Sequence, residues 1–406
     1  MKVLFTSVFL EHPAAGGPQL KIENAIKALS RVCEIDIISR EPELVDETGE
    51  AAQFFKEFCT EFHVVPRIKQ KRSGNRYFRK LKSIFDQIFD LENSKDASFI
   101  LEHIDRRNID ILWFGYGNIS FPLIKKIKSM RPNLKVVCDT DSVWSRFVLR
   151  ELPYAKGFRK LRIFLSGRKK EDEEREWVNL CEATTAVSEV DAKYYRSIAT
   201  DKTRVHIFSN VIDIDSYKNA PPPPDNFKSP SIYLAGSFGH YHSPMDAAAR
   251  WVLSDILPLV RKAVPDVHFY IIGRNSDIRF GHVGDSAVTV TGKVETVLPY
   301  LCNTDVALVP LKFESGTRFK ILEAGACKVP LVSTVLGAEG IPVKHGEHIL
   351  LADESEEFAN AIIRLLGDKK FASTLAENCF QLVHDRFSVE ALAVEAKQIL
   401  EYLTHD

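Results

Sequence analysis

The chain has 406 residues, a formal net charge of −1 and a hydrophobic fraction of 45%. This length exceeds one typical hydrophobic core and fits two domains of about 200 residues each. The nearly neutral charge gives no electrostatic case for nucleic acid as a partner. The chain contains no run of about 18 apolar residues, so no membrane-spanning helix is predicted. The seven cysteines form no Cys-x-x-Cys pair, which predicts reduced cysteines of a cytoplasmic protein rather than disulfides or zinc ligands.

Apolar runs of strand length alternate with segments of helical periodicity in the first half of the chain, which is the pattern of an α/β domain. We interpret the opening run, residues 2–8, as a buried strand and not as a signal peptide, because no Ala-x-Ala cleavage site follows it. A loop with Gly16 and Gly17 comes next, and residues 159–180 have the period of a long charged helix. The other strands predicted in this half are residues 35–39, 62–65, 109–114, 135–138, 183–187 and 205–208.

Four consecutive prolines at positions 221–224 indicate the boundary between two domains, because such a run is stiff and extended and cannot form a helix or a central strand. We predict an N-terminal domain at 1–212, a C-terminal domain at 213–387 and a helix at 388–406 that packs back toward the N-terminal domain. Ser388 is a favourable N-cap for that helix. The strands predicted in the second half are residues 231–235, 267–272, 288–291, 306–310 and 331–334.

Open α/β sheets bind ligands at the carboxyl ends of their strands, and glycine-bearing loops follow three predicted strands of the second half. Gly236 and Ser237 come directly after strand 231–235 and before a helix, where backbone N–H groups and the helix dipole favour phosphate. A glycine turn without any ligand is the alternative. The third loop, 333–340, would by itself be interpreted as a turn.

The second loop connects a strand to a helix and carries the strongest candidates. Gly316 and Thr317 suit a loop that exposes backbone N–H groups. Arg318 and Lys320 place two cations at a helix start, where their charge opposes the helix dipole, and a bound polyphosphate would relieve that conflict. Glu323 lies farther along the helix, where a carboxylate can accept both hydroxyls of a ribose. The alternative is a surface loop with a solvated glutamate.

Several stretches of the chain resemble group 1, or family 4, retaining glycosyltransferases of the GT-B fold. They resemble most closely the sugar transferases associated with exosortase and polysaccharide export. The resemblance implies an α/β protein with two facing Rossmann-like domains and a cleft between them. The matching positions are Gly316 to Ala326, Pro330 to Thr334, Gly337 to Gly340, Gly236-Ser237, Tyr241, Pro244, Asp246-Ala247, Trp251, Asp139, Asp141, Ser145, Arg146 and Ala186 to Glu189.

The resemblance also implies roles for single residues in holding a nucleoside-diphosphate sugar. Glu323 would bind the ribose, whereas Arg318 and Lys320 would contact the pyrophosphate. Gly236 and Ser237 would face the pyrophosphate from the other side. The remaining donor-side positions are Arg274 at a strand end, Val294 and Glu295 in the segment that holds the base, and Gly316 and Thr317 in the loop.

Three departures from the family pattern affect the candidate site. Ser315 stands where the wider family has the first glutamate of its Glu-x7-Glu motif. The Arg and Lys that many members carry after the position of Gly236 are absent, and Arg318 and Lys320 are their substitutes in our interpretation. The histidine of the first-domain cleft has no clear match, and Asp141 lies nearest to its position.

The implied reaction is substitution at the anomeric carbon with retention of configuration. Negative charge grows on the departing diphosphate, so Arg318 and Lys320 are the candidates for catalysis. No cofactor or metal is required for this chemistry. The acceptor should meet the first domain, at Gly16, Gly17, Asp139, Asp141 and Arg146. Asp141 is the candidate base, with a capping carboxylate as the alternative, and the Asp-x-Asp spacing of Asp139 and Asp141 leaves metal binding as a minor option.

Two basic segments with interleaved aromatic residues, 67–82 and 156–170, could dock on anionic lipid, which would suit a lipid-linked acceptor. A solvated charged face is the equal alternative. The expected partners are therefore the nucleotide-sugar donor, a sugar, lipid-linked or other small acceptor, and an anionic membrane surface at the inner face of the membrane. The rival functions are a non-catalytic nucleotide-sugar-binding subunit, a nucleotide-sugar epimerase and a phosphorylase.

Overall fold

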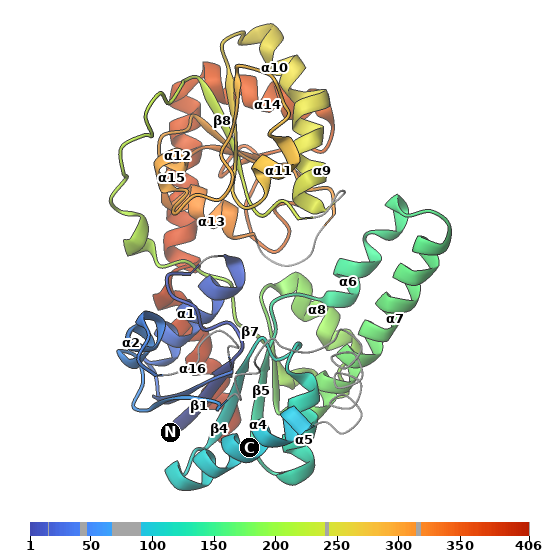
Figure 1. Cartoon of the computed structure of the whole chain (residues 1–406), viewed down its shortest axis with the longest axis vertical. Helices are drawn as coiled ribbons and strands as arrows, with labels where there is room; N and C mark the ends of the chain where they lie inside the picture. The colour runs from blue at the N-terminus through green and yellow to red at the C-terminus, as the bar shows by residue number, and fades with distance from the viewer. Residues whose placement is uncertain (15, 41–46, 67–90, 240–242, 314–317, 406) are drawn as a thin grey trace, which may run out of the picture. The chain divides into compact units, whose positions relative to one another are not determined.

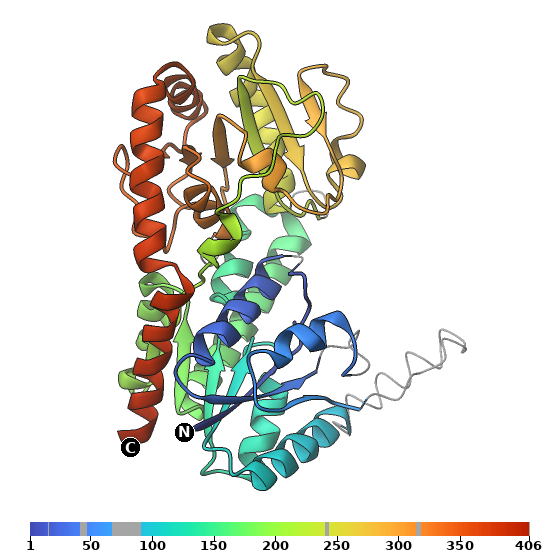
Figure 2. The same cartoon turned by 90° about the vertical axis from the view of Figure 1, so that its left-hand side faces the viewer.

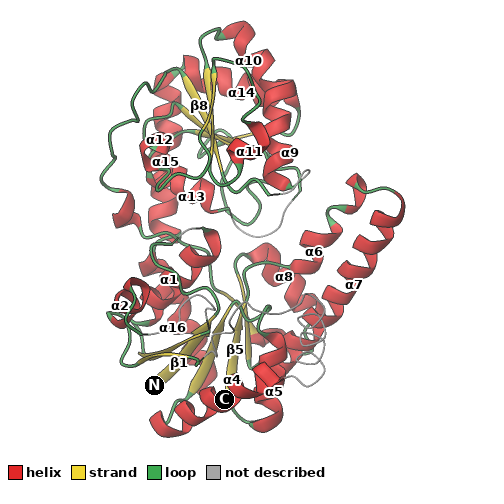
Figure 3. Ribbon diagram, in the orientation of Figure 1, coloured by secondary structure: helices red, strands yellow, loops and turns green. Residues whose placement is uncertain are grey.

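The computed structural model describes residues 1–14, 16–40, 47–66, 91–239, 243–313 and 318–405. The chain divides into two compact units. The first contains Met1–Asp141, Arg168–Ser209 and Leu392–Asp406, and the second contains Ser142–Gly167 and Asn210–Ala391. Each unit has its own sheet with helices around it (Figures 1 and 3).

The first unit contains a parallel sheet in the order β3-β2-β1-β4-β5-β6-β7. Every residue of β4 is buried, as expected for a central parallel strand that is covered on both faces. The strands are β1 (Lys2–Ser7), β2 (Glu34–Ser39), β3 (Phe62–Val64), β4 (Ile111–Gly115), β5 (Lys135–Asp139), β6 (Ala183–Ala186) and β7 (Val205–Ile207). The helices that contribute to this unit are α1 (Gly17–Leu29), α2 (Glu50–Lys56), α4 (Leu91–Arg107), α5 (Phe121–Met130), α7 (Gly157–Leu180), α8 (Glu189–Ile198), the short η2 (Lys202–Arg204) and α16 (Val389–His405).

The second unit contains another parallel sheet, in the order β10-β9-β8-β11-β12-β13. Its strands are β8 (Ser231–Ala235), β9 (His268–Ile272), β10 (Val288–Val290), β11 (Val306–Val309), β12 (Leu331–Ser333) and β13 (Leu350–Leu351). Its helices are α6 (Trp144–Leu149), η1 (Leu152–Tyr154), η3 (Ile214–Tyr217), α9 (Pro244–Trp251), the π-helical η4 (Val252–Ile256), α10 (Leu257–Ala263), α11 (Ser276–Phe280), α12 (Leu298–Leu301), α13 (Phe319–Ala326), α14 (Ser355–Gly367) and α15 (Lys369–Arg386).

Residues 142–167, which the sequence pattern placed in the N-terminal domain, group with the second unit. Two side-chain contacts within that unit agree with this grouping. The guanidinium of Arg150 lies 2.6 Å from a carboxylate oxygen of Glu339, and the rings of Tyr154 and Phe313 lie 5.3 Å apart. Helix α7 therefore begins in the second unit and continues in the first.

The C-terminal helix α16 contributes residues 392–406 to the first unit. Ser388 caps its start, because its hydroxyl accepts a hydrogen bond of 3.3 Å from the backbone N–H of Ala391. Farther along, the carboxylate of Glu395 accepts hydrogen bonds of 2.7 and 2.9 Å from the backbone and hydroxyl of Ser209. Near the end of α16, the carbonyl of Leu403 accepts a hydrogen bond from the ammonium of Lys135. Figure 2 shows this helix running to the C terminus.

The strands predicted from apolar runs are confirmed, with ends that differ by one or two residues. The predicted start at residue 109 is wrong, because the N–H of Ile109 bonds back to the carbonyl of Ile104 and β4 begins only at Ile111. All seven cysteines are free. Within the described residues, no helix is both long and apolar enough to cross a membrane.

Candidate functional site

The strand order of the second sheet reverses beside β8, since β8 lies between β9 and β11. Ligands of open α/β sheets bind outside the carboxyl ends of the strands at such a reversal. Gly236 and Ser237 follow β8, Arg274 follows β9, and α13 comes after β11. Because all these strands are parallel, the predicted donor residues on these segments lie at one edge of the sheet.

The loops after β8 and β9 pack against each other through their backbones. The N–H of Gly236 donates to the carbonyl of Ile272 at 2.9 Å, and the N–H of Phe238 donates to the carbonyl of Arg274 at 2.9 Å. Gly273 has φ +120°, and a Cβ atom there would lie 2.2 Å from the carbonyl oxygen of Gly236. Ser237 and the side chain of Arg274 are exposed, so both can reach a ligand at this edge.

Arg318 is the N-cap of α13 and is buried, whereas Lys320 in the first turn is half-buried. Gly316 and Thr317 lie outside the described residues. Glu323 stands one turn farther along the helix and is half-buried. Burial raises the pKa of the Glu323 carboxyl, and the charge of Lys320 and a hydrogen bond from Tyr217 oppose that rise.

Tyr217 is a residue of this site that the sequence analysis missed. Its hydroxyl donates a hydrogen bond of 3.3 Å to Oε1 of Glu323. It belongs to the short helix η3, whose start is capped by Asp213. The two partners are 106 positions apart and no spacing rule connects them, so only packing of η3 against α13 could reveal the contact.

Val294 and Glu295 follow the strand next to β9 and are half-buried and exposed respectively. The carbonyl of Gly292 accepts a hydrogen bond of 3.0 Å from the N–H of Gly273, and the N–H of Gly292 donates to the Ser276 hydroxyl at 2.9 Å. These bonds connect the segment predicted to hold the base to the loops that follow β8 and β9.

In the first unit the strand order reverses beside β1, which lies between β2 and β4. Gly16 and Gly17 stand at the start of α1, after β1, with Pro18 in the first turn as is favourable for a helix N-terminus. Arg146 lies on α6, which belongs to the second unit, so the predicted acceptor residues do not all fall in one unit.

Asp139 and Asp141 come at and after the end of β5 and have different surroundings. Asp139 is fully buried; its Oδ1 lies 2.9 Å from the ammonium of Lys21 and accepts a hydrogen bond of 2.7 Å from Thr185. Lys21 on α1 was missed by the sequence analysis. Asp141 is half-buried and accepts a hydrogen bond of 2.6 Å from the side-chain amide of Asn118. Of the two carboxylates, Asp141 is the more accessible to a substrate.

Comparison with known proteins gives one family match and one curated relative. The family model described as "Glycosyl transferases group 1" matches residues 230–368, about a third of the chain. An uncharacterized 44.6 kDa protein in the cps region of Klebsiella pneumoniae is 23% identical over 146 residues. That match covers 34% of this chain and 38% of the Klebsiella protein, so it spans well under two thirds of the relative's length.

The whole chain is similar to several solved structures. The Anabaena protein HepE, in complex with UDP and glucose, is 15% identical with a TM-score of 0.63, and the match covers 100% of both chains. Sucrose-phosphate synthase from Thermosynechococcus elongatus is 16% identical with a TM-score of 0.68, over 100% of this chain and 99% of the other. The chain therefore has the GT-B fold, with two Rossmann-like domains, and residues 230–368 of its second unit match the group 1 glycosyltransferases.

Proposed function

We propose that the chain is a retaining glycosyltransferase whose second unit holds a nucleoside-diphosphate sugar. The observation that carries this proposal is the set of groups at the carboxyl edge of the second sheet. Gly236 and Gly273 leave backbone groups without a covering side chain. The cations Arg318 and Lys320 stand at the start of α13, and the carboxylate of Glu323 lies one turn farther along that helix. The matched family segment, 230–368, includes all of these residues. Because HepE is described in complex with UDP and glucose, a uridine nucleotide is the first donor to test.

The proposed division of labour follows from charge. Arg318 and Lys320 stabilise the negative charge that grows on the leaving diphosphate, so they favour the transition state over the bound donor. Glu323 accepts hydrogen bonds from the ribose hydroxyls, held in place by Tyr217. In this proposal the two basic side chains supply the positive charge, and no cofactor takes part in the transfer.

For the acceptor, we propose that Asp141 of the first unit is the base. The hydrogen bond from Asn118 orients the carboxylate of Asp141, which is half-buried. Asp139 is less suitable, because its carboxylate is fully buried and already bonds to the ammonium of Lys21 and the hydroxyl of Thr185, so it is not accessible to an acceptor. The positive charge of Lys21 beside Asp139 would repel a metal ion, which argues against the alternative that Asp139 and Asp141 together bind one.

The start of α7 supports a lipid-linked acceptor in an anionic membrane. The apolar side chains of Phe158, Leu161 and Leu165 are 82%, 52% and 58% exposed, at intervals of three and four residues. Exposed basic residues alternate with them at Lys156, Lys160 and Arg162. Farther along the same helix Arg168 and Lys170 pair with Glu171 and Glu173 at 2.6 Å, so the surface suited to lipid is the first part of the helix. The other basic segment, 67–82, lies outside the described residues.

The donor site is tested by thermal unfolding with UDP, GDP, ADP, CDP and dTDP. A nucleotide at 100 times its Kd adds about 2.7 kcal/mol, which shifts the midpoint by several degrees. We expect one nucleotide to stabilise the wild type and Glu323→Gln to abolish that shift. The matched control is Glu401→Gln on α16, which should respond as the wild type does. If no nucleotide stabilises the protein, the second unit is not a donor site.

Turnover separates the proposal from its rivals. A glycosyltransferase releases nucleoside diphosphate from the sugar donor only with an acceptor. An epimerase consumes the donor sugar without one, and a binding subunit shows the thermal shift with no turnover on any acceptor.

Membrane contact is tested by sedimentation with vesicles of phosphatidylglycerol and of phosphatidylcholine. We expect binding to the anionic vesicles alone, and its loss in the double variant Phe158→Ser, Leu161→Ser. Val394→Ser, which changes a residue of α16 that is 58% exposed, is the matched control. Equal binding by the double variant and the wild type would contradict membrane docking through α7.

A further inference from the structure

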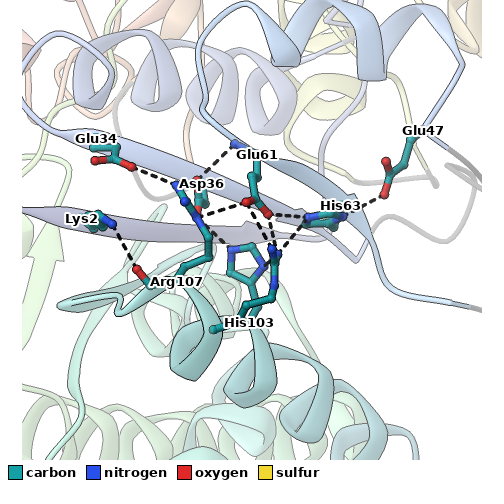
Figure 4. Close-up of polar contacts among 9 residues, drawn as sticks. Lys2, Glu34, Asp36, Glu47, Glu61, His63, His103 and Arg107 are labelled. Atoms are coloured by element: carbon teal, nitrogen blue, oxygen red, sulfur yellow. Dashed lines mark hydrogen bonds and ion pairs between the residues drawn. The ribbon is translucent and has the colours of Figure 1, made fainter.

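A cluster of two histidines and one glutamate lies in the first unit, away from the carboxyl edge of its sheet. Glu61 precedes β3, His63 lies within β3, and His103 lies on α4. One ligand atom of each lies within 4.8 Å of the others. Figure 4 shows the three side chains pointing toward one another, with Asp36 of β2 to one side of them. Nothing in the proposed sugar transfer uses these residues.

Two further carboxylates determine which ring nitrogens face the centre of this cluster. Nε2 of His103 lies 2.9 Å from Oδ2 of Asp36, and Nδ1 of His63 lies 3.1 Å from Oε1 of Glu47. The opposite nitrogens, Nδ1 of His103 and Nε2 of His63, face the centre of the cluster, and Nε2 of His63 lies 3.0 Å from Oε2 of Glu61. Histidines that ligate metals are oriented by carboxylates in this way.

The guanidinium of Arg106 stands where these two nitrogens and the Glu61 carboxylate converge. Its Nη2 lies 2.5 Å from Oε2 of Glu61, 3.0 Å from Nδ1 of His103 and 3.5 Å from Nε2 of His63. This nitrogen has only two hydrogens, and one atom of each of the three cluster residues lies around it. Arg106 lies in the last turn of α4 and its side chain is 53% exposed, so the guanidinium can turn into solvent without crossing the core.

We propose that Glu61, His63 and His103 bind a divalent transition-metal ion, and that Arg106 occupies the position of the ion in the metal-free protein. Two imidazole nitrogens and one carboxylate oxygen are a ligand set that suits zinc and neighbouring first-row ions. Zinc bonds to such atoms are about 2.0–2.2 Å long, so the ligands close around the ion as Arg106 leaves.

The site has a structural role in this proposal. The three ligands come from edge strand β3, the residue before it, and α4, so a bound ion would tie that edge of the sheet to the helix beside it. Asp36 is the third residue of β2, and Arg106 and Arg107 end α4, which places the site toward the amino ends of the strands. The groups proposed for sugar transfer follow the carboxyl ends.

The first test is a calorimetric titration of the full chain with Zn²⁺ after treatment with a chelator. We expect one ion per chain, and Co²⁺ in its place should give the visible absorption of a bound tetrahedral or five-coordinate ion. His63→Asn should weaken Zn²⁺ binding by about tenfold or more. The matched control is His384→Asn on α15, an exposed histidine beside Asp385, which should bind as the wild type does. Equal binding by His63→Asn and the wild type overturns the proposal.

The second test removes the competing cation. Arg106→Gln keeps a polar side chain but takes away the positive charge at the centre of the cluster, so Zn²⁺ should bind about tenfold tighter or more. Arg131→Gln, which changes an exposed arginine paired with Asp105, is the matched control. If the Arg106 variant binds no tighter than the wild type, or neither binds, the cluster is not a metal site. This variant keeps the ligands and their carboxylate partners, so the test holds even where a histidine variant fails to fold.

Discussion

The ammonium of Lys21 lies 2.9 Å from Oδ1 of Asp139, and both side chains are buried in the first unit. The pair joins the first helix of the unit to the end of β5, where Thr185 of β6 also donates to the same carboxylate oxygen. A buried ion pair of this kind is costly to break, because removal of one partner leaves the other charge uncompensated.

Asp139→Asn should therefore lower the free energy of unfolding by about 3–5 kcal/mol, measured by urea denaturation. The double variant Lys21→Met, Asp139→Leu removes both charges and should recover much of that loss. Glu401→Gln breaks an exposed pair with Lys397 and should cost less than about 1 kcal/mol. A loss of that small size for Asp139→Asn would mean that the pair contributes no more to stability than an exposed pair does.

Tyr217→Phe should weaken nucleotide binding by a smaller factor than Glu323→Gln does. The variant removes the hydroxyl that donates to Oε1 of Glu323 and leaves the ring in place. A hydrogen bond to a charged group contributes about 1.5–3 kcal/mol, and this one is long at 3.3 Å, so a decrease in affinity of roughly tenfold is expected by calorimetry. Tyr154→Phe, at a tyrosine that is 58% exposed, is the control. Unchanged affinity in Tyr217→Phe would show that Tyr217 does not position the glutamate.

Gly273→Ala should destabilise the second unit and abolish the nucleotide-dependent thermal shift. The residue has φ +120°, and the added Cβ would lie 2.2 Å from the carbonyl oxygen of Gly236, so the loops after β8 and β9 must separate. Strained backbone of this kind costs of order 1–3 kcal/mol. Gly284→Ala, at a glycine with open space around it, should unfold and bind nucleotide as the wild type does. Retained nucleotide binding in Gly273→Ala would place the phosphate site elsewhere.

Acid should destabilise the first unit through Asp36 and Glu61. Burial would raise the pKa of Asp36, but hydrogen bonds from His103 and Arg107 outweigh it and lower the value to about 2. Hydrogen bonds from Arg106 and His63 lower the pKa of Glu61 to about 2. The unfolded values are near 4, so the stabilisation is present above about pH 4 and is lost as the pH falls toward 2.

Urea denaturation between pH 5 and pH 2.5 measures this dependence. The free energy of unfolding should fall with pH more steeply in the wild type than in Asp36→Asn, which no longer takes up a proton at this position. Glu401→Gln lies outside the cluster and should keep the wild-type slope. Identical slopes in the wild type and Asp36→Asn would show that the pKa of Asp36 is not lowered in the folded protein.

The sequence by itself determined the strands and the loops that follow them. Residues 231–235 form β8 as predicted, because an apolar run between a proline and a glycine is a local signal that needs no partner to be recognised. Parallel strands bring their carboxyl ends to one edge, so the pattern also predicted that Gly236 and the start of α13 lie at the same edge of the second sheet.

Only the tertiary structure decided which side chains touch. Three contacts join residues that are far apart in the chain: Lys21 with Asp139, Tyr217 with Glu323, and His103 with the neighbouring pair Glu61 and His63. Periodicity reports which face of an element is buried, but not which residue of another element packs on it. The grouping of residues 142–167 with the second unit has the same cause, since contacts such as that of Arg150 with Glu339 depend on packing between distant segments.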